Sequence, residues 1–311
     1  MKVEALCISD KKGTPKRPVE RVRLLPDHGI EGDAHAGGWH RQVSLLAAEE
    51  VAVWRERLPD LGPGDFAENI LLSGVDFDSL GLGSRLRLGE ETEVEVTQIG
   101  KECGGHRCTV VERLGDCLMP RRGLFARVLR GGVVSLGDPV QIVRAVSRQT
   151  IQAAVLTISD RCARGEATDT AGPAAAALLE RELGAHIYAN DILPDEAERI
   201  SQWLREMAGR GVDLILTVGG TGFAPRDVTP EATRAVVERP TPGLDEAMRA
   251  ASLANTPHAM LSRGTSGIRG RTLIVNLPGS ERGATENLLA ILPALPHGIE
   301  KLRGDPSDCG R

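Results

Sequence analysis

The chain has 311 residues, of which 41% are hydrophobic, 26% are charged and only 3% are aromatic. This composition excludes disordered and fibrous architectures, and the length predicts two domains. The net charge is -5, and residues 1–150 and 151–311 are each slightly acidic, so we expect no nucleic-acid partner. No segment approaches the ~18 apolar residues of a membrane span, and no signal region follows Met1, so we expect a cytoplasmic protein that does not bind a membrane.

Short β-rich segments separated by Gly and Pro dominate the first half. They predict strands at Val3–Ile8, Arg85–Leu88, Val94–Ile99 and Val140–Val143. One helix is expected from about Leu45 to Arg57. Short strands at this spacing indicate a barrel-like or sandwich domain.

At about residue 148 the pattern changes, which divides the chain into residues 1–147 and 148–311. From there apolar strands alternate with helices. Strands are expected at Ala153–Ile158, Val212–Val218 and Thr272–Leu277, and helices at Pro173–Leu183, Glu196–Met207, Pro230–Glu238, Gly243–Leu253 and from Glu281. This alternation predicts a three-layer α/β domain with a mostly parallel sheet, which binds ligands outside the carboxyl ends of its strands.

One glycine-rich loop follows the strand that ends at Val218. It consists of Gly219, Gly220, Thr221 and Gly222. Glycines allow positive φ and bring backbone N–H groups close to a ligand, so the loop is suited to cradling phosphates, although a tight strand-to-helix connection is the alternative. Further on, Thr229 suits an N-cap and Pro230 the first helical position.

Two aspartates are expected at the same edge of the sheet. Asp227 stands beside Arg226, and Asp195 precedes the helix at 196–207. An exposed salt bridge for Asp227 and an N-cap for Asp195 are the simpler interpretations. The sharper hypothesis makes both carboxylates ligands of Mg²⁺, which binds through one or two carboxylates plus substrate phosphates.

The last strand also leads into polar loop residues. Pro278, Gly279 and Ser280 open a helix whose N-terminal N–H groups favour an anion, although Ser280 can serve as an N-cap alone. Asn276 near the strand end and Ser262 in an upstream loop are candidates for reading a ligand's polar edge. Together these loops predict a nucleotide-type site.

The second half contains a series of motifs in a fixed order. The motifs are Thr157-Ile-Ser-Asp-Arg161, Asp169-Thr-Ala-Gly-Pro173, Leu193-Pro-Asp-Glu196, Gly219-Gly-Thr-Gly222, Arg226-Asp-Val-Thr-Pro-Glu231, Leu261-Ser-Arg263 and Asn276-Leu-Pro-Gly-Ser280. This series resembles the molybdopterin adenylyltransferase family, the MogA/MoaB-like domain of molybdenum cofactor biosynthesis. The resemblance covers residues 151–305 and implies that molybdopterin attacks the α-phosphorus of MgATP, giving adenylylated molybdopterin and pyrophosphate.

The resemblance also implies roles for individual residues. The family's two essential aspartates fall on Asp195 and Asp227, which are expected to bind Mg²⁺ and position substrate. Residues 219–222 and 278–280 are expected to cradle nucleotide phosphates, while Ser262 and Asn276 contact the pterin. A homo-oligomer, trimeric or larger, is expected, with the molybdate-inserting enzyme as a candidate partner.

The first half also contains a set of characteristic segments. They are Glu31-Gly-Asp33-Ala-His35, His40-Arg-Gln-Val-Ser-Leu45, Phe66-Ala-Glu68-Asn69 and Cys103, within residues 1–145. Together they resemble a MOSC domain, a β-rich module related to the C-terminal part of molybdenum cofactor sulfurases. Cys103 aligns with the family's characteristic Cys, although Lys101 and Glu102 precede it where many relatives have Arg and Pro. Arg41 is expected to hold an anion, because a guanidinium binds phosphate bidentately.

The segment around Cys103 leaves three interpretations open. A sulfur carrier needs an accessible thiolate beside cations. A zinc site could use Cys103, His106, Cys108 and Cys117, while inert buried thiols are the third interpretation. His35 and His40 either line a pocket or satisfy turn hydrogen bonds.

From both halves together we expect an adenylyltransferase joined to a module that binds or sulfurates the cofactor. The alternatives are a non-catalytic molybdopterin carrier and, less favoured, a molybdate-inserting domain.

Overall fold

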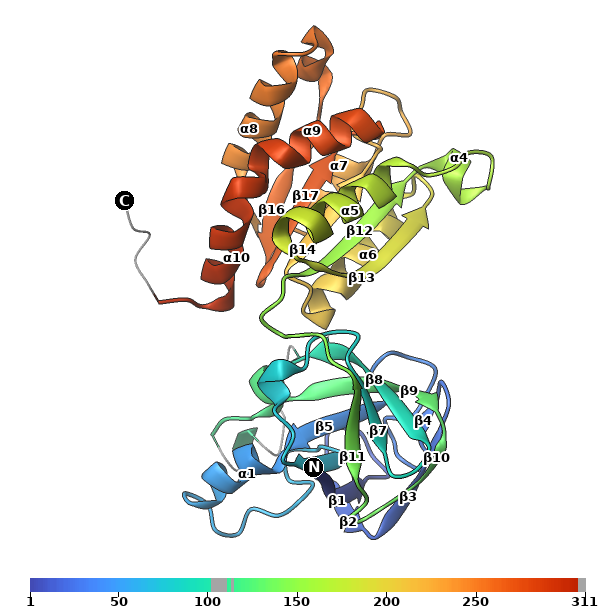
Figure 1. The fold of residues 1–311 in the computed structure, drawn as a ribbon, viewed down its shortest axis with the longest axis vertical. Helices are drawn as coiled ribbons and strands as arrows, with labels where there is room; N and C mark the ends of the chain where they lie inside the picture. The colour runs from blue at the N-terminus through green and yellow to red at the C-terminus, as the bar shows by residue number, and fades with distance from the viewer. Residues whose placement is uncertain (102–110, 113–114, 307–311) are drawn as a thin grey trace. The chain divides into compact units, whose positions relative to one another are not determined.

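The computed structural model describes residues 1–101, 111–112 and 115–306 (Figure 1). The chain divides into two compact units between Gln149 and Thr150, next to the change of pattern at residue 148. Both units have aliphatic cores, as the scarcity of aromatic residues requires. No helix in the described part of the chain is both long enough and apolar enough to cross a bilayer.

The N-terminal unit consists of two sheets and few helices. The larger sheet has the strand order β11-β7-β8-β9-β5-β6-β1-β2, and the smaller one has the order β10-β3-β4. The strands are β1 (Lys2–Ile8), β2 (Arg17–Val19), β3 (Arg21–Leu25), β4 (Gly29–Ile30), β5 (Val43–Ala47), β6 (Ile70–Ser73), β7 (Arg85–Leu88), β8 (Thr92–Ile99), β9 (Leu124–Arg130), β10 (Gly132–Ser135) and β11 (Val140–Arg144). The short helical segments are α1 (Ala48–Arg55), η1 (Phe77–Ser79) and α3 (Met119–Arg122).

This larger sheet curls toward closure. Its pairs are antiparallel except for β5 with β6. A single β-bridge joins Lys2 of β1 to Pro139, which directly precedes β11 at the far end of the strand order. The barrel-like architecture expected for this half is therefore confirmed, and the four strands predicted there are present.

The helix expected from Leu45 to Arg57 is wrong in its first turn. Leu45–Ala47 belong to β5, all five of whose residues are buried between β6 and β9, and α1 begins only at Ala48. A short apolar run can be a buried strand or a buried helix, and periodicity alone does not distinguish them. Pairing with two neighbouring strands decides for the strand.

The C-terminal unit is a six-stranded sheet with the order β13-β12-β14-β17-β16-β15. The strands are β12 (Gln152–Ile158), β13 (His186–Leu193), β14 (Leu214–Val218), β15 (Arg239–Pro240), β16 (Ser266–Arg269) and β17 (Thr272–Leu277). The helices are α4 (Asp160–Ala163), α5 (Ala171–Leu183), α6 (Ala197–Arg210), α7 (Thr229–Arg234), α8 (Pro242–Leu253), η2 (Pro257–Leu261), α9 (Glu281–Ile291), η3 (Leu292–Ala294) and α10 (Leu295–Arg303).

Helices cover both faces of this sheet (Figure 1). The first four strands in the order are parallel, and β16 and β15 add an antiparallel edge. The buried core between the sheet and α5 and α9 is built from Ala, Val, Leu and Ile. The predicted three-layer α/β class with a mostly parallel sheet is confirmed.

Three strands of this sheet were not predicted from the sequence patterns. Strand β13 lies at the edge, and its residues are half-buried or exposed, so it lacks the apolar run that marks a central strand. Strands β15 and β16 are too short to show a period. The helix expected at Pro230–Glu238 is also shorter, because α7 ends at Arg234.

Candidate functional site

Four loops meet at the carboxyl edge of the parallel sheet in the C-terminal unit. They follow β12, β13, β14 and β17, and hydrogen bonds join them directly. The Ser159 N–H donates to the Leu193 carbonyl at 3.0 Å, and the Gly219 N–H donates to the Leu277 carbonyl at 3.1 Å. The loops that the sequence singled out therefore share one edge, as the topology of a parallel sheet requires.

The glycine-rich loop runs through a space that side chains would fill. Gly219 and Gly220 have φ values of 104° and 63°, in the left-handed region that favours glycine. A Cβ on Gly220 would lie 2.3 Å from the Thr229 Oγ1 and 3.0 Å from the Asp195 Oδ1. A Cβ on Gly222 would lie 2.8 Å from the Asp227 Oδ2. The backbone therefore passes between the two aspartates with no room for larger residues.

Three successive amides of this loop are available to a ligand. Within the described residues, no acceptor receives the N–H groups of Gly220, Thr221 or Gly222. Consecutive backbone N–H groups of this kind form a concave anion site without any basic side chain. These available N–H groups favour the hypothesis that the loop cradles phosphates over the alternative that it is only a tight strand-to-helix connection.

Each of the two aspartates is held by one carboxylate oxygen. The Asp160 N–H donates to the Asp195 Oδ2 at 3.0 Å, and the Ala224 N–H donates to the Asp227 Oδ2 at 2.8 Å. The second oxygen of each carboxylate has no partner among the described residues, which suits a hard cation that also binds substrate phosphates. The described part of the chain has no group of three or more metal-ligating side chains, so substrate would have to supply further ligands.

The N-cap interpretation of Asp195 is wrong. The N-cap of α6 is Glu196, and its side chain makes no capping bond. Asp195 is engaged instead with the loop after β12, because its N–H donates to the Asp160 Oδ1 at 3.1 Å in return for the bond described above. Thr229 is likewise not an N-cap: it is the first residue of α7, and its buried Oγ1 has no partner in the described structure.

Electrostatic repulsion accompanies this arrangement. Burial raises the pKa of Asp195, and the neighbouring carboxylates of Asp160 and Asp227 raise it further. Hydrogen bonding to Arg226 holds the pKa of Asp160 below its ordinary value. Asp160, Asp195 and Asp227 thus place three carboxylates near Arg226, an excess of negative charge in this group that a cation would neutralise.

Two arginines that sequence reasoning left without a role organise these loops. Arg226 binds Asp160 with two hydrogen bonds of 3.0 and 2.7 Å, so the salt bridge expected for the Arg226–Asp227 pair goes to a different aspartate. Arg263 donates to the Gly222 carbonyl at 2.7 Å, to Glu231 at 2.6 Å and to the Asp227 carbonyl. The only sequence signal for either residue was a cation within a loop that follows a strand or short helix.

The Asn276 side chain makes hydrogen bonds within the protein through both its amide nitrogen and its amide oxygen. Its Nδ2 donates to the hydroxyls of Thr217 and Thr233, both at 2.8 Å, and its Oδ1 accepts from the Thr265 N–H at 3.2 Å. The side chain is 2% exposed. It connects β17 with β14, α7 and the segment before β16, so its contact with pterin stays a prediction that these bonds do not favour.

The two candidate serines have local partners. Ser280 is the N-cap of α9, and its Oγ accepts from the Gly283 N–H at 3.2 Å, as its simpler interpretation holds. Ser262 ends η2, and its Oγ lies 3.4 Å from the Gly264 N–H. A Cβ on Gly279 would lie 3.2 Å from the Gly219 Cα, so the loop 278–280 packs against the glycine-rich loop. Roles for these residues in ligand binding remain predictions.

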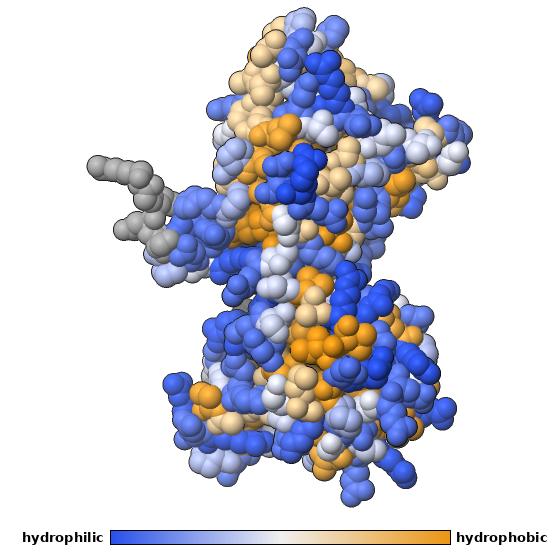
Figure 2. Space-filling model, in the orientation of Figure 1, coloured by the Kyte–Doolittle hydropathy of each residue, from blue (hydrophilic) through white to orange (hydrophobic). Residues whose placement is uncertain are grey.

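Two hollows lie on the C-terminal unit. One, of about 480 Å³, borders the glycine-rich loop and is lined by Phe223, Ala224, Pro225, Asp227, Val228, Glu231 and Arg263. The larger, of about 750 Å³, is an apolar groove between α8, α9 and α10 that reaches Leu273 near the amino end of β17. Figure 2 shows hydrophobic residues in the area of α9 and α10. Of these two, the smaller hollow is lined by Asp227 of the candidate site and begins at Phe223, next to the glycine-rich loop.

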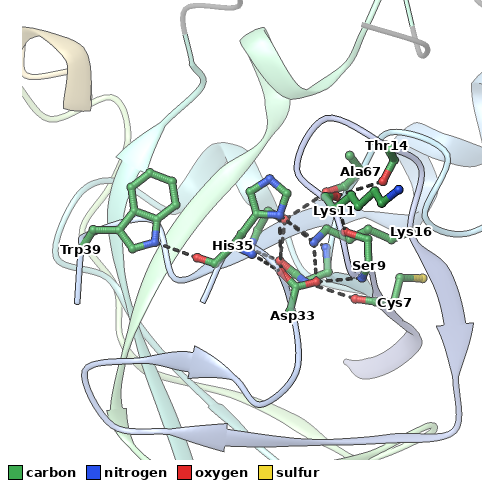
Figure 3. A network of polar contacts seen from close by, with 11 residues as sticks. Cys7, Ser9, Lys11, Thr14, Lys16, Asp33, His35, Trp39 and Ala67 are labelled. Atoms are coloured by element: carbon green, nitrogen blue, oxygen red, sulfur yellow. Dashed lines mark hydrogen bonds and ion pairs between the residues drawn. The ribbon is translucent and has the colours of Figure 1, made fainter. Parts of the chain in front are cut away.

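A buried ion pair organises the turn that carries His35 in the N-terminal unit (Figure 3). The Lys16 Nζ lies 2.6 Å from the Asp33 Oδ2 and 3.1 Å from the His35 Nδ1. Both charged side chains are almost completely buried. Burial opposes ionisation of Asp33, but hydrogen bonds from His35 and Lys16 outweigh it and lower its pKa. These contacts match the interpretation of His35 as a residue that satisfies a turn.

Glu68 is a second buried ionisable group in this unit. Its Oε1 accepts from the Gly64 N–H at 2.5 Å, while its Oε2 is buried with no partner in the described structure. Burial raises the pKa of Glu68 to about 7. This carboxyl group is therefore partly protonated near neutral pH.

Arg41 lies among aromatic rings and other cations. Its Cζ is 4.7 Å from the ring centre of Trp39 and 5.9 Å from that of Phe125. Lys12 and Lys101 approach the same two rings, at 5.4 and 6.0 Å. The Arg41 Nε is buried and has no hydrogen-bond partner in the described residues. Clustered cations with an unused donor fit the predicted anion site.

The predicted thiol cluster falls mostly outside the described residues. Cys103, His106 and Cys108 belong to the segment 102–110. Cys117 is described and is buried at 4% exposure. The sulfur-carrier and zinc hypotheses therefore stay predictions.

His40 contacts Gln98 at 2.8 Å, so it has a partner on a neighbouring strand.

Comparisons with known proteins match both halves of the chain. The family described as "MOSC domain" matches residues 32–141, and the family described as "Probable molybdopterin binding domain" matches residues 154–297. The chain is 45% identical to gephyrin from Dictyostelium discoideum over 161 residues, which is 49% of this chain but 22% of that protein. It is 41% identical to molybdopterin adenylyltransferase from Helicobacter pylori (strain J99) over 159 residues, which is 50% of this chain and 90% of that protein.

Further relatives show the same coverage of about half the chain. A molybdenum cofactor biosynthesis bifunctional protein from Chlorobaculum tepidum is 36% identical over 152 residues, which is 49% of this chain and 48% of that protein. The crystal structure of a molybdopterin biosynthesis enzyme, MoaB from Thermus thermophilus, is 50% identical and covers 50% of this chain and 99% of its own, with a TM-score of 0.48. The chain thus spans a minor part of the larger relatives and nearly all of the adenylyltransferase.

Proposed function

The chain belongs to the molybdopterin-binding family that includes the molybdopterin adenylyltransferases, and a MOSC domain precedes that family's domain. We propose that its C-terminal unit transfers an adenylyl group from ATP to molybdopterin in molybdenum cofactor biosynthesis. The observation that carries the proposal is the row of three amides at residues 220–222, which lie between two aspartates and donate to no acceptor in the described part of the chain.

The chemistry requires positioning more than covalent participation by the protein. An oxygen of the terminal phosphate of molybdopterin attacks the α-phosphorus of ATP. The bond from that phosphorus to the bridging oxygen breaks, and pyrophosphate leaves with the electron pair. Such a transfer depends on alignment of the two reactants and on neutralisation of charge at the phosphates. A rigid backbone cradle can align the phosphates, and a pair of carboxylates could hold the cation that neutralises their charge.

Individual residues take distinct parts in this proposal. The amides of 220–222 bind phosphate oxygens of ATP, and the N-terminus of α9 at 278–280 faces the same loop. Asp195 and Asp227 would hold Mg²⁺, which neutralises phosphate charge when it is bound. Arg263 keeps the cradle in shape through its bonds to Gly222 and to the Asp227 carbonyl.

We propose that the N-terminal unit binds an anionic group of the same cofactor. Arg41 supplies the unused Nε donor, and Lys12 and Lys101 add positive charge around Trp39 and Phe125. Sulfur transfer by Cys103, assembly into a trimer or larger homo-oligomer and contact with the molybdate-inserting enzyme remain expectations from the resemblance.

Incubation of the full chain with molybdopterin and MgATP tests the enzymatic proposal. We expect stoichiometric pyrophosphate and a product heavier by one adenylyl group in mass spectrometry. Asp195→Asn and Asp227→Asn are expected to abolish both, whereas Glu198→Gln on the exposed side of α6 serves as the control. Tight binding of molybdopterin by the wild-type chain without pyrophosphate release would contradict the proposal and support the non-catalytic carrier.

A further inference from the structure

Asp160 is the residue through which three loops of the site are joined. Its N–H and its Oδ1 exchange hydrogen bonds with the carboxylate and the N–H of Asp195, at 3.0 and 3.1 Å. Its carboxylate also receives two hydrogen bonds from Arg226, 66 residues further along the chain. Asp160 thus connects the loop after β12 with the loop that carries Asp195 and with the loop that carries Asp227.

These bonds determine where the Asp195 carboxylate points. With its Oδ2 held by the Asp160 amide, Asp195 directs its Oδ1 toward Gly220, where an added Cβ would lie 3.0 Å away. The amide of Asp195 is anchored to the Asp160 carboxylate at the same time, so neither its backbone nor its side chain is free to turn. The Asp195 carboxylate is thereby presented to the phosphate cradle.

The ion pair between Asp160 and Arg226 is not explained by a contribution to stability. The Arg226 side chain is 60% exposed, and solvent-exposed ion pairs contribute little to stability. The Arg164–Glu166 pair, at the end of α4, is also bidentate and exposed, but it contacts neither Asp195 nor the glycine-rich loop. The two pairs differ in what they hold in place.

We propose that Asp160 is a positioning residue that aims the Asp195 carboxylate at the phosphate-binding loop. It does so through reciprocal hydrogen bonds, in which the backbone N–H of each residue donates to the carboxylate of the other. Its ion pair with Arg226 is the secondary contact, which restrains Asp160 itself. This inference rests on the proposed adenylyl transfer for its kinetic consequences, but its geometric part concerns the protein alone.

Three substitutions separate the two contacts. Asp160→Asn keeps an acceptor for the Asp195 N–H and loses the ion pair, and Arg226→Gln loses the ion pair alone. Asp160→Ala loses both of these side-chain contacts but keeps the bond from its own backbone N–H to the Asp195 Oδ2. Glu166→Gln is the matched control, since it breaks an exposed bidentate pair at the end of the same helix. In adenylyl transfer by the full chain, we expect Asp160→Ala to lower kcat about 100-fold, the effect of misplacing a reacting group by roughly 1 Å.

The other variants are expected to retain activity. Asp160→Asn and Arg226→Gln should remain within about fivefold of the wild-type kcat, and the control within about twofold. The KM for MgATP should change by less than about threefold in Asp160→Asn, Arg226→Gln and the control, because these variants leave the phosphate-binding amides and an acceptor for the Asp195 N–H in place. Equal losses in Asp160→Ala, Asp160→Asn and Arg226→Gln would overturn the proposal, because they would show that the ion pair acts alone.

Amide hydrogen exchange at Asp195, measured by NMR without substrate, provides a second readout. Asp160→Ala should accelerate exchange at this amide about tenfold, while Asp160→Asn and the control should leave it within about twofold. Unchanged exchange in Asp160→Ala would refute the positioning role whatever the activity. If wild-type protein transfers no adenylyl group, the proposed function fails, and the exchange measurement still decides the geometric part of this inference.

Discussion

Replacement of Asn276 by Ala tests whether this residue maintains the site or reads the substrate. The side chain is 2% exposed and makes three hydrogen bonds, two as donor to the hydroxyls of Thr217 and Thr233 and one as acceptor from the Thr265 N–H. Truncation removes all three and leaves the backbone N–H of Thr265 without this acceptor.

The expected loss follows from that count. At about 1 kcal/mol for each buried hydrogen bond, Asn276→Ala should lower the free energy of unfolding by about 3 kcal/mol. For a domain of roughly 150 residues, each kcal/mol corresponds to about 2–4 °C, so the Tm of the C-terminal unit should fall by about 6–12 °C. Calorimetry of the full chain resolves this change if the two units unfold in separate transitions.

Asn287 offers a matched comparison. It is also a buried Asn, 5% exposed, and its Nδ2 donates to the Ser252 Oγ and the Gly283 carbonyl at 2.7 and 2.8 Å. With two hydrogen bonds, Asn287→Ala should lower the free energy of unfolding by about 2 kcal/mol and the Tm by about 4–8 °C, without removing any hydrogen bond of Asn276. If Asn276→Ala leaves the Tm within about 1 °C of wild type while it abolishes molybdopterin binding, the structural interpretation is refuted and the predicted pterin contact is supported.

Three further predictions concern both units. Gly220→Ala places a Cβ 2.3 Å from the Thr229 Oγ1 at a φ of 63°, so we expect it to cost about 2–4 kcal/mol of stability and to eliminate ATP binding in calorimetry; a variant that binds ATP normally would contradict the cradle. Burial raises the pKa of Glu68 above its unfolded value, so its contribution to stability is present below about pH 4.5 and is lost as pH rises through about 7. The N-terminal unit should therefore lose about 3 kcal/mol across that range in urea unfolding, and Glu68→Gln should reduce this slope; equal slopes would show that another group is responsible. Arg41→Gln should weaken binding of inorganic phosphate to the N-terminal unit about tenfold, whereas Arg57→Gln, in the exposed turn after α1, should not; similar affinities in both variants would argue against an anion site at Arg41.

Much of the candidate site at the carboxyl edge of the sheet could be predicted from local patterns. Apolar strands followed by Gly-rich or acidic loops mark the carboxyl ends of parallel strands, and these ends meet at one edge in any such sheet. For this reason Asp195, Asp227 and residues 219–222 were expected near one another, and the structure brings them together. The motif order likewise indicated both families, which the comparisons confirm.

Tertiary structure alone decided which polar groups satisfy one another. The Asp160–Arg226 pair spans 66 residues, and the Asn276 amide is shared among segments up to 59 residues apart. The buried Lys16–Asp33 pair also depends on residues that are distant in sequence. So does the strand at Leu45–Ala47, where a helix was expected. A local pattern reports which face of an element is apolar, whereas hydrogen-bond partners depend on the three-dimensional placement of loops, and a buried polar group is stable only where that placement supplies a partner.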